Sequence, residues 1–262
     1  RYLGRGLRPQ RMSQPVLICR PGERGETLAD ALRASEGWVE SLDVMHLEAL
    51  PEDATQRQVW LDIDQYHKIV VVSPFAAYCL SEALDRYWPQ LPQGLELYAV
   101  GQATAMVLHQ ALGLKVRVPA PAAGEETSEA LLALASLQRL EHQRVLLVAG
   151  EGGRPLLGDT LGQRGARVTR LEVYRRRLIT PDAGARTWLE QGGYQALVVS
   201  SGEILEHLAR WCSEAAFQQP LVVSSQRLAT LAKTLGFRIP VVASGASPAA
   251  LAAAVARNCD PG

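Results

Sequence analysis

The chain has 262 residues, which is enough for about two domains of ordinary size. Hydrophobic residues make up 47% and charged residues 21%, so a disordered chain, a collagen and a coiled coil are excluded. Lys plus Arg and Asp plus Glu both number 27, and this balance argues against a dedicated nucleic-acid-binding protein. An anionic ligand would therefore have to be held by a local group of residues.

The cysteines, histidines and apolar runs narrow the class further. The four cysteines form no CxxC pair, and four in a chain of this length are not a disulfide scaffold, so we expect a reducing compartment, the cytoplasm. The five histidines are scattered, so no zinc or other metal site is predicted. No apolar stretch approaches the roughly 18–20 residues of a membrane helix. Residues 1–11 are basic and carry no acid, and we expect them to be a non-native or disordered tail outside the fold.

Short β-branched runs alternate with helical patterns along the rest of the chain. Several runs are continuously apolar, which is typical of parallel strands buried on both faces. The windows between them place apolar residues at three- and four-residue spacing, as Leu228, Leu231 and Leu235 show. The alternation predicts an α/β fold with parallel sheets. We expect strands at 16–19, 68–73, 95–101, 115–118, 144–149, 195–200, 221–224 and 238–243, and helices at 27–36, 74–87, 103–112, 128–137, 154–164, 204–211 and 226–235.

The sequence also repeats itself. Residues 99–118 align with residues 222–241, and residues 16–44 align more loosely with residues 145–173. Generic strand–helix units resemble one another, so chance similarity is the other interpretation. The alignment nevertheless favours two similar α/β units in one chain.

Two longer segments, 38–50 and 167–180, follow the first strand–helix unit of each repeat. Each mixes alternating polarity with a run too long for one buried strand. We expect them to form a two-stranded β connector. The predicted architecture is two parallel-sheet, flavodoxin-like α/β domains with a ligand cleft between them. The first domain is discontinuous, from 14–46 and 174–258, and the second is the insert 50–172.

The loops that follow the strands are where parallel sheets bind ligands. They are rich in Ser, Thr and Gly at the starts of helices, and two interpretations stay open. One is that these residues only cap helices. The other is that free backbone N–H groups and the positive end of the helix dipole bind carboxylate or phosphate. The loops are Arg20-Pro21-Gly22, Ser73-Pro74-Phe75, Gly101-Gln102-Ala103-Thr104, Gly150-Glu151-Gly152-Gly153-Arg154, Ser200-Ser201-Gly202-Glu203 and Ser224-Ser225-Gln226-Arg227.

The sequence GEGGR at 150–154 is the most specific of these loops. It lacks the GK[ST] ending of a nucleotide P-loop. Its glycines would let the backbone approach a ligand, and Arg154 could bind a carboxylate through its guanidinium. A tight turn with an exposed arginine would have the same sequence.

Tyr174 is the candidate proton donor. A phenol at this position could donate a hydrogen bond to a leaving group. The repeat aligns Tyr174 with Met45, so an aromatic residue is not common to both halves. A strand tyrosine that only packs against its neighbours is the other interpretation.

Seven motifs occur in a fixed order: RPG (20–22), VSPFAA (72–77), AVGQATA (99–105), AGEGGRPLLGDTL (149–161), EVYRR (172–176), VVSSGEIL (198–205) and VVSSQRLATLA (222–232). As an ordered set they resemble the uroporphyrinogen-III synthase family, over about residues 14–257. The resemblance implies a cofactor-free lyase of tetrapyrrole biosynthesis. The substrate in that family is the linear tetrapyrrole hydroxymethylbilane. Separately, we expect a monomer, because no exposed apolar repeat or heptad is evident in the sequence.

The resemblance also implies a reaction and a set of site residues. The terminal hydroxyl is expelled, ring D is inverted through a spiro intermediate, and the macrocycle closes to the type III isomer. Without enzyme the bilane closes to type I, so the main task is to hold a reactive chain in the right conformation. Tyr174 would assist departure of the hydroxyl. The substrate contacts would be Arg20, Ser73, Gln102, Thr104, Gly150, Gly153, Arg154, Ser200, Ser201, Gly202, Ser225 and Gln226.

One loop departs from the family pattern. Where the first half has the GxxTA-type turn at 101–105, the second half has Ser224 and Arg227 at the Gly and Thr positions. The resemblance therefore supports backbone contacts from this loop more than side-chain contacts. A non-catalytic two-domain cleft protein that binds a small polyanionic metabolite is the alternative function. A flavin or nucleotide protein would need a phosphate loop that the sequence lacks.

Overall fold

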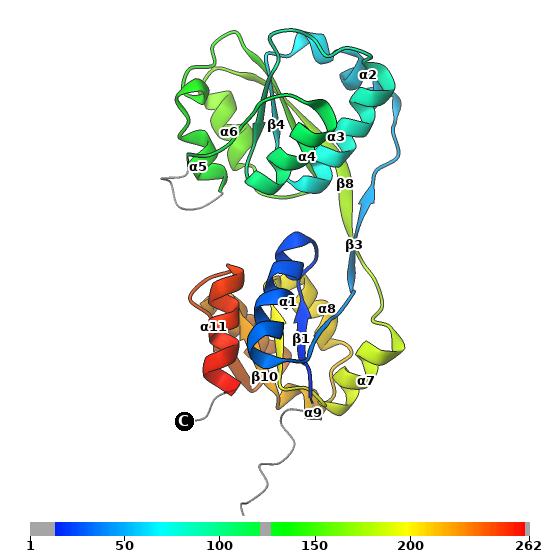
Figure 1. Cartoon of the computed structure of the whole chain (residues 1–262), viewed down its shortest axis with the longest axis vertical. Helices are drawn as coiled ribbons and strands as arrows, with labels where there is room; N and C mark the ends of the chain where they lie inside the picture. Colours follow the sequence, from blue (N-terminus) through cyan, green and yellow to red (C-terminus); the bar gives the residue numbers. More distant parts are fainter. Residues whose placement is uncertain (1–13, 121–126, 260–262) are drawn as a thin grey trace, which may run out of the picture. The chain divides into compact units, whose positions relative to one another are not determined.

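A computed structural model describes residues 14–120 and 127–259, and the predicted tail at 1–11 lies outside these residues. The chain divides into two compact units. The first takes the described residues up to His46 and from Leu178 onward, and the second takes Leu47–Arg177. Each unit has its own sheet with helices on both faces (Figure 1).

The first unit contains a five-stranded sheet in the order β11-β10-β9-β1-β2, and every neighbouring pair is parallel. Its central strands are wholly apolar and buried because helices cover both faces. The strands are β1 (Val16–Cys19), β2 (Val39–Ser41), β9 (Ala196–Val199), β10 (Pro220–Val223) and β11 (Ile239–Val242).

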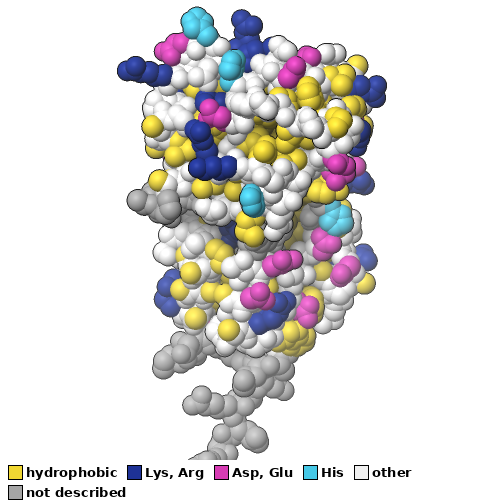
Figure 2. Space-filling model, turned by 45° about the horizontal axis from the view of Figure 1, so that its top comes forward, with side chains coloured by type: hydrophobic (Ala, Val, Ile, Leu, Met, Phe, Trp, Pro, Cys, Tyr) yellow, Lys and Arg dark blue, Asp and Glu magenta, His cyan; other side chains and the backbone are white. Residues whose placement is uncertain are grey.

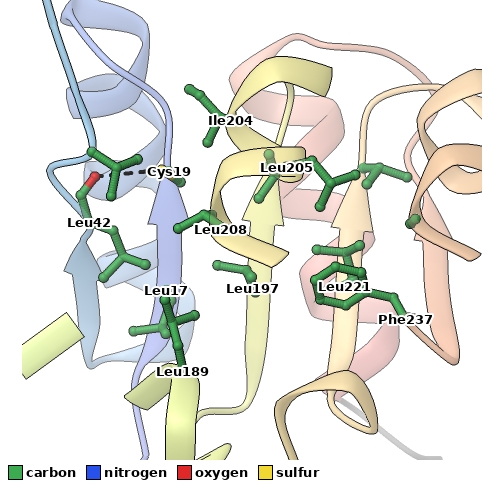
Figure 3. Packing of buried hydrophobic residues seen from close by; sticks show 14 of the residues in the cluster. Leu17, Cys19, Leu42, Leu189, Leu197, Ile204, Leu205, Leu208, Leu221 and Phe237 are labelled. Atoms are coloured by element: carbon green, nitrogen blue, oxygen red, sulfur yellow. Dashed lines mark hydrogen bonds between the residues drawn. The ribbon is translucent and has the colours of Figure 1, made fainter. Parts of the chain in front are cut away.

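Two hydrophobic layers enclose this sheet. Helices α1 and α11 pack on one face, and α7 to α10 supply the layer on the other. Figure 3 shows the second layer, where Leu17, Leu197 and Leu221 of three neighbouring strands lie with the apolar face of α8. The helices are α1 (Glu23–Glu36), α7 (Ala183–Gln191), α8 (Gly202–Ala209), α9 (Glu214–Phe217), α10 (Gln226–Leu235) and α11 (Pro248–Cys259).

The second unit contains a six-stranded sheet in the order β3-β8-β7-β4-β5-β6. The five strands from β8 to β6 are parallel to their neighbours, and β3 forms the edge beside β8. The strands are β3 (Met45–Ala49), β4 (Lys68–Val71), β5 (Glu96–Ala99), β6 (Val116–Arg117), β7 (Arg144–Gly150) and β8 (Arg167–Leu178).

Helices cover both faces of this second sheet as well. Figure 1 shows α3 and α4 on one side of β4 and α5 and α6 on the other, in agreement with two separate hydrophobic clusters. The helices are α2 (Ala54–Leu61), α3 (Pro74–Tyr87), α4 (Gln102–Leu112), α5 (Ser128–Leu132) and α6 (Leu156–Gln163), with short 3₁₀ turns η2 (Ile63–Gln65) and η4 (Ala135–Leu137).

The prediction of one helix over 128–137 was wrong, because the helix ends at Leu132 and a 3₁₀ turn follows. Side chains from elsewhere satisfy the carbonyl groups that the break leaves free. The guanidinium of Arg164 donates to the carbonyls of Leu132 and Leu137, at 2.6 and 2.9 Å. The amide of Gln138 donates to Leu132 and Leu134. These bonds compensate for the lost helical turn.

The predicted internal repeat is confirmed by the strand orders. The order β11-β10-β9-β1-β2 in the first sheet corresponds to β6-β5-β4-β7-β8 in the second. The aligned segments 99–118 and 222–241 span equivalent strand–helix–strand units. Counted along the chain, however, only the first sheet has the flavodoxin-like order 2-1-3-4-5, and the parallel strands of the second read 3-2-1-4-5. In both sheets the order reverses at the same place, between β1 and β9 and between β4 and β7.

Within the predicted extended segment at 38–50 the structure has two strands. Residues 42–44 separate β2, which pairs with β1, from β3, which lies beside β8. Between the two strands, Leu42 and Val44 lie in the core of the first unit, and the N–H of Leu42 donates to the carbonyl of Ile18 at 2.8 Å. The N–H of Ile179 donates to the carbonyl of Val44 at 2.9 Å, and that of Leu50 donates to Val173 at 2.9 Å.

Candidate active site

The hydroxyl groups of Ser73 and Tyr174 meet in the second unit at the carboxyl edge of its sheet. Their oxygens lie 2.9 Å apart. Ser73 follows β4 and is the N-cap of α3, where its Oγ accepts the N–H of Ala76 at 3.3 Å. Tyr174 lies on β8, where the pairing of this strand with β7 ends, and it is buried. The sequence placed both residues among the candidates, and the structure brings them together.

A register shift turns Tyr174 toward Ser73. On β8, Glu172 pairs with Ala149 and Tyr174 pairs with Gly150, so Val173 is an extra residue. Because strand side chains alternate between faces, Tyr174 would otherwise point to the face opposite Val173. The bulge places the tyrosine in the same buried cluster as Val173 and Leu171. Bulges commonly redirect a side chain in this way.

The ring of Tyr174 is held on several sides. Phe75, in the first turn of α3, contacts it edge to face with ring centroids 5.1 Å apart. Gly150, the last residue of β7, lies directly against the ring. The sequence indicated Gly150 as a substrate contact and did not identify Phe75. The motif VSPFAA offered the only signal for Phe75, because it stands two residues after Ser73.

The loop after β7 is shaped by two side chains of β8 that the sequence did not indicate. The guanidinium of Arg170 donates to the carbonyls of Gly150 and Gly152. The carboxylate of Glu172 accepts the N–H of Gly152 at 3.3 Å. Gly152 and Gly153 have φ angles of 74° and 83°, which glycine adopts without the strain of a side chain. Arg170 and Glu172 are two residues apart on one strand, so their side chains share a face of the sheet. This spacing is the sequence feature that could have indicated both residues.

Arg154, which we expected to bind a carboxylate of the ligand, forms an ion pair with a carboxylate of this chain. Its Nη2 lies 2.5 Å from Oε1 of Glu129, the second residue of α5. Both side chains are more than half exposed. The hydrogen bond from Arg154 lowers the pKa of Glu129 below the usual range for glutamate. Such an exposed pair is weak, so a ligand carboxylate can compete for the guanidinium.

Two further candidates of the second unit lie at the start of α4, next to β5. Gly101 is the N-cap and offers no side chain to the helix N-terminus, so the first backbone N–H groups have no side-chain cap. Gln102 is exposed, whereas Thr104 is buried with only 3% of its surface accessible. Gln102 is therefore exposed at the start of α4, whereas Thr104 lies on the buried face of the same helix.

In the first unit, Arg20 follows β1, on one side of the point where the strand order reverses. Its guanidinium donates to the carbonyl of Ala246. Burial and the neighbouring Arg24 lower the pKa of Arg20. No acidic side chain pairs with Arg20 among the side chains that the structure describes. The N-cap of the adjacent helix α1 is Gly22, which has no side chain to cap the helix.

The serines of the first unit follow β9 and β10, the next two strands of that sheet. Ser200 is half-buried, and Ser201 caps α8 by accepting the N–H of Ile204 at 3.5 Å. Ser225 caps α10 in the same way, at 3.3 Å from the N–H of Leu228. Gly202 packs against α10, and Gln226 is exposed. The capping interpretation thus applies to Ser73, Ser201 and Ser225, although each hydroxyl can still donate one hydrogen bond.

Metals and membranes receive no support from the part of the chain that the structure covers. Within residues 14–120 and 127–259, no group of three or more His, Cys, Asp or Glu side chains could hold a metal ion. None of the helices there is long and apolar enough to cross a membrane. Figure 2 shows basic and acidic side chains interspersed on one face, as the zero net charge leads us to expect.

Comparison with known proteins identifies the family. A family model described as uroporphyrinogen-III synthase HemD matches residues 26–253. The uroporphyrinogen-III synthase of Escherichia coli is 35% identical over 246 residues, which cover 90% of this chain and 97% of that protein. The chain belongs to the uroporphyrinogen-III synthase family. The Salmonella typhimurium synthase shows the same identity and coverage.

Solved structures of the family share the fold. A mutant uroporphyrinogen III synthase from Thermus thermophilus gives a TM-score of 0.53 at 21% identity, covering 93% of this chain and 98% of that one. The Helicobacter pylori enzyme gives a TM-score of 0.56 at 15% identity, covering 90% and 96%. The α/β fold with parallel sheets is therefore that of known uroporphyrinogen III synthases. The resemblance inferred from the motifs is confirmed, and the non-catalytic alternative has no support.

Proposed function

We propose that the chain converts hydroxymethylbilane to uroporphyrinogen III, with loss of the terminal hydroxyl as water and inversion of ring D. Family membership supports the reaction. The observation that carries the residue assignment is the 2.9 Å contact between the hydroxyls of Ser73 and Tyr174. It stands where the strand order reverses between β4 and β7, which is the usual ligand position in such sheets.

The contact supports Tyr174 as the donor to the leaving hydroxyl. Ser73 Oγ accepts the N–H of Ala76, and its own proton can be donated to Tyr174 Oη. The phenolic proton is then free to be donated to the departing oxygen of the bilane. Such a chain of hydrogen bonds polarises its last member, and it starts at the positive end of α3. Hydroxyl loss is thereby assisted without a metal or cofactor.

The acetate and propionate groups of the bilane would bind at the loops after the strands. In the second unit these are the GEGGR loop with Arg154 and the start of α4. In the first unit they are Arg20, the start of α1, and the serine loops before α8 and α10. Helix starts without side-chain caps, as at α1 and α4, offer backbone N–H groups to carboxylates. A chain of zero net charge can bind a polyanion in this way.

The proposal includes the architecture expected for the family. The two units would act as domains, with predicted boundaries at 14–46, 50–172 and 174–258. Segments 38–50 and 167–180 would form the connector, and the bilane would contact the carboxyl edges of both sheets in a cleft. We also propose a monomer in the cytoplasm. The free thiols of Cys19, Cys79 and Cys212 are consistent with a reducing compartment.

The test is the isomer composition of the product. The purified protein is added to freshly generated hydroxymethylbilane, the product is oxidised, and the porphyrin isomers are separated by chromatography. We expect type III to dominate. Type I alone, formed at the rate of the enzyme-free reaction, would refute the proposal.

A further inference from the structure

Gly150 stands where a side chain cannot fit. It is buried at the end of β7 and pairs with Tyr174 across the register shift. A Cβ atom on Gly150 would lie 2.5 Å from Cζ of Tyr174, 2.8 Å from Cε2 and 2.9 Å from Oη. Contacts below 3.0 Å essentially never occur for real Cβ atoms. The space that any other residue would fill is therefore filled by the phenol.

We propose that Gly150 is a positioning residue, whose missing side chain allows Tyr174 to reach Ser73. This inference rests on the proposed function, in which the phenol assists loss of the hydroxyl. It differs from the assignment of Gly150 as a substrate contact. The side of Gly150 that a Cβ would occupy faces the ring of Tyr174, and its carbonyl accepts a hydrogen bond from Arg170 at 3.3 Å.

The ring has little freedom to make room for a methyl group. Phe75 contacts the ring, and Leu171 and Val173 belong to the same buried cluster. The backbone of Tyr174 is fixed as well, because its carbonyl accepts the N–H of Glu151 at 2.7 Å. A methyl group at position 150 must therefore displace the phenol. Since the contact with Ser73 is at ordinary hydrogen-bond length, a shift of about 1 Å is enough to break it.

The other glycines of this strand–helix unit have different surroundings. Gly152 and Gly153 are needed for their positive φ angles, and a Cβ on Gly152 would meet nothing within 4 Å. Gly162, inside α6, also has open space around its Cβ position and no positive φ angle. Gly162→Ala is therefore a matched control, because it adds the same methyl group to the same unit without meeting an atom.

The first experiment is a double-mutant cycle in catalysis. We expect Gly150→Ala to lower kcat for type III formation about 100-fold, the same loss that we expect for Tyr174→Phe, with KM changed less than about threefold. The double variant should be no slower than Tyr174→Phe alone, because no hydroxyl is left to misplace. Gly162→Ala should keep wild-type kcat. A Gly150→Ala enzyme with wild-type kcat, or a double variant in which the two losses multiply, would overturn the inference.

The second experiment measures folding and does not depend on the reaction. We expect Gly150→Ala to lower the melting temperature of the wild type, and to lower that of a Tyr174→Ala chain much less, because the clashing ring is then absent. If Tyr174→Ala and Gly150→Ala lower the melting temperature additively, the steric argument is wrong. If the wild type yields only type I, the proposed function fails, while the result of this stability cycle still stands.

Discussion

The hydroxyl oxygens of Ser73 and Tyr174 lie 2.9 Å apart, although 101 positions separate the two residues in the sequence. The adjacency of β4, β7 and β8 brings them to one edge of the sheet, and the extra residue Val173 turns the tyrosine toward the serine. Ser73 thereby links the start of α3 to the phenol. The pair gives the proposed chemistry a specific geometry that can be broken one group at a time.

Replacing Ser73 should affect both catalysis and stability. Ser73→Ala removes the hydrogen bond to Tyr174 and the N-cap of α3. We expect kcat for type III formation to fall about tenfold or more, because the phenol loses its donor. The lost cap should cost about 1 kcal/mol of unfolding free energy, measured by urea denaturation.

The matched control for Ser73→Ala is the loss of an N-cap residue from a different helix. Asp182 caps α7 by accepting the N–H of Ala185 at 2.8 Å and takes no part in the proposed site. Asp182→Ala should show a similar loss of stability with unchanged kcat. Wild-type kcat in the Ser73→Ala enzyme would remove the serine from the mechanism.

Arg154 should contribute to substrate binding more than to the chemical step. Its guanidinium is exposed and paired only weakly with Glu129, so a carboxylate of the bilane can take its place. We expect Arg154→Gln to raise KM about fivefold with kcat unchanged, and the effect to shrink as salt screens the charge. Steady-state kinetics at low and high ionic strength measure the change in KM and its dependence on salt.

An exposed pair elsewhere serves as the comparison for Arg154. Arg238 pairs with Glu214 at the surface of the first unit, and both side chains are more than half exposed. Arg238→Gln should leave KM unchanged. Equal KM values for wild type and Arg154→Gln would show that the arginine is only a surface residue.

Glu96 should stabilise the second unit in a pH-dependent way. It accepts hydrogen bonds from Tyr98 at 2.9 Å and from the buried Lys68 at 3.2 Å, and it pairs with Arg117 at 2.9 Å. Burial raises the pKa of Glu96, but these bonds and charges outweigh it, so the pKa is lowered from its usual 4.5. Because the folded-state pKa is the lower one, the stabilisation is present above the usual pKa and is lost as the pH falls.

The test is Glu96→Gln in urea unfolding at neutral and acidic pH. We expect the variant to lose about 2 kcal/mol near pH 7, less than for a fully buried pair because a third of the carboxylate side chain is exposed. The gap between the two proteins should narrow in acid. A constant difference across the pH range would contradict the assigned cause.

Much of the fold could be predicted from the sequence because buried parallel strands have a simple apolar pattern. The run at 144–149 and the helix at 74–87 show this clearly, and the helix bounds agree to the residue. The limits of the two strands within 38–50 could not be predicted, because they depend on which distant strands each pairs with and on the packing of Leu42 and Val44 in the core of the first unit. Local periodicity carries no information about such long-range burial.

In the candidate site, too, local patterns could be predicted and long-range contacts could not. Strand ends and helix starts placed Ser73 and Arg154 at the carboxyl edge, since such loops have a recognisable composition. The bulge at Val173 could not be seen, because a single extra residue leaves no mark in strand polarity. The contact of Glu129 with Arg154 was also hidden, since 25 positions separate the two residues.

The most direct test of the central claim is the type III fraction produced by wild type and Tyr174→Phe, measured side by side with an enzyme-free reaction. The variant keeps the ring and its packing and loses only the hydroxyl. We predict mostly type III from the wild type, and from the variant about 100-fold slower enzymatic turnover, with type I accumulating from spontaneous closure. Equal rates and equal type III fractions from the two proteins would contradict the role assigned to Tyr174.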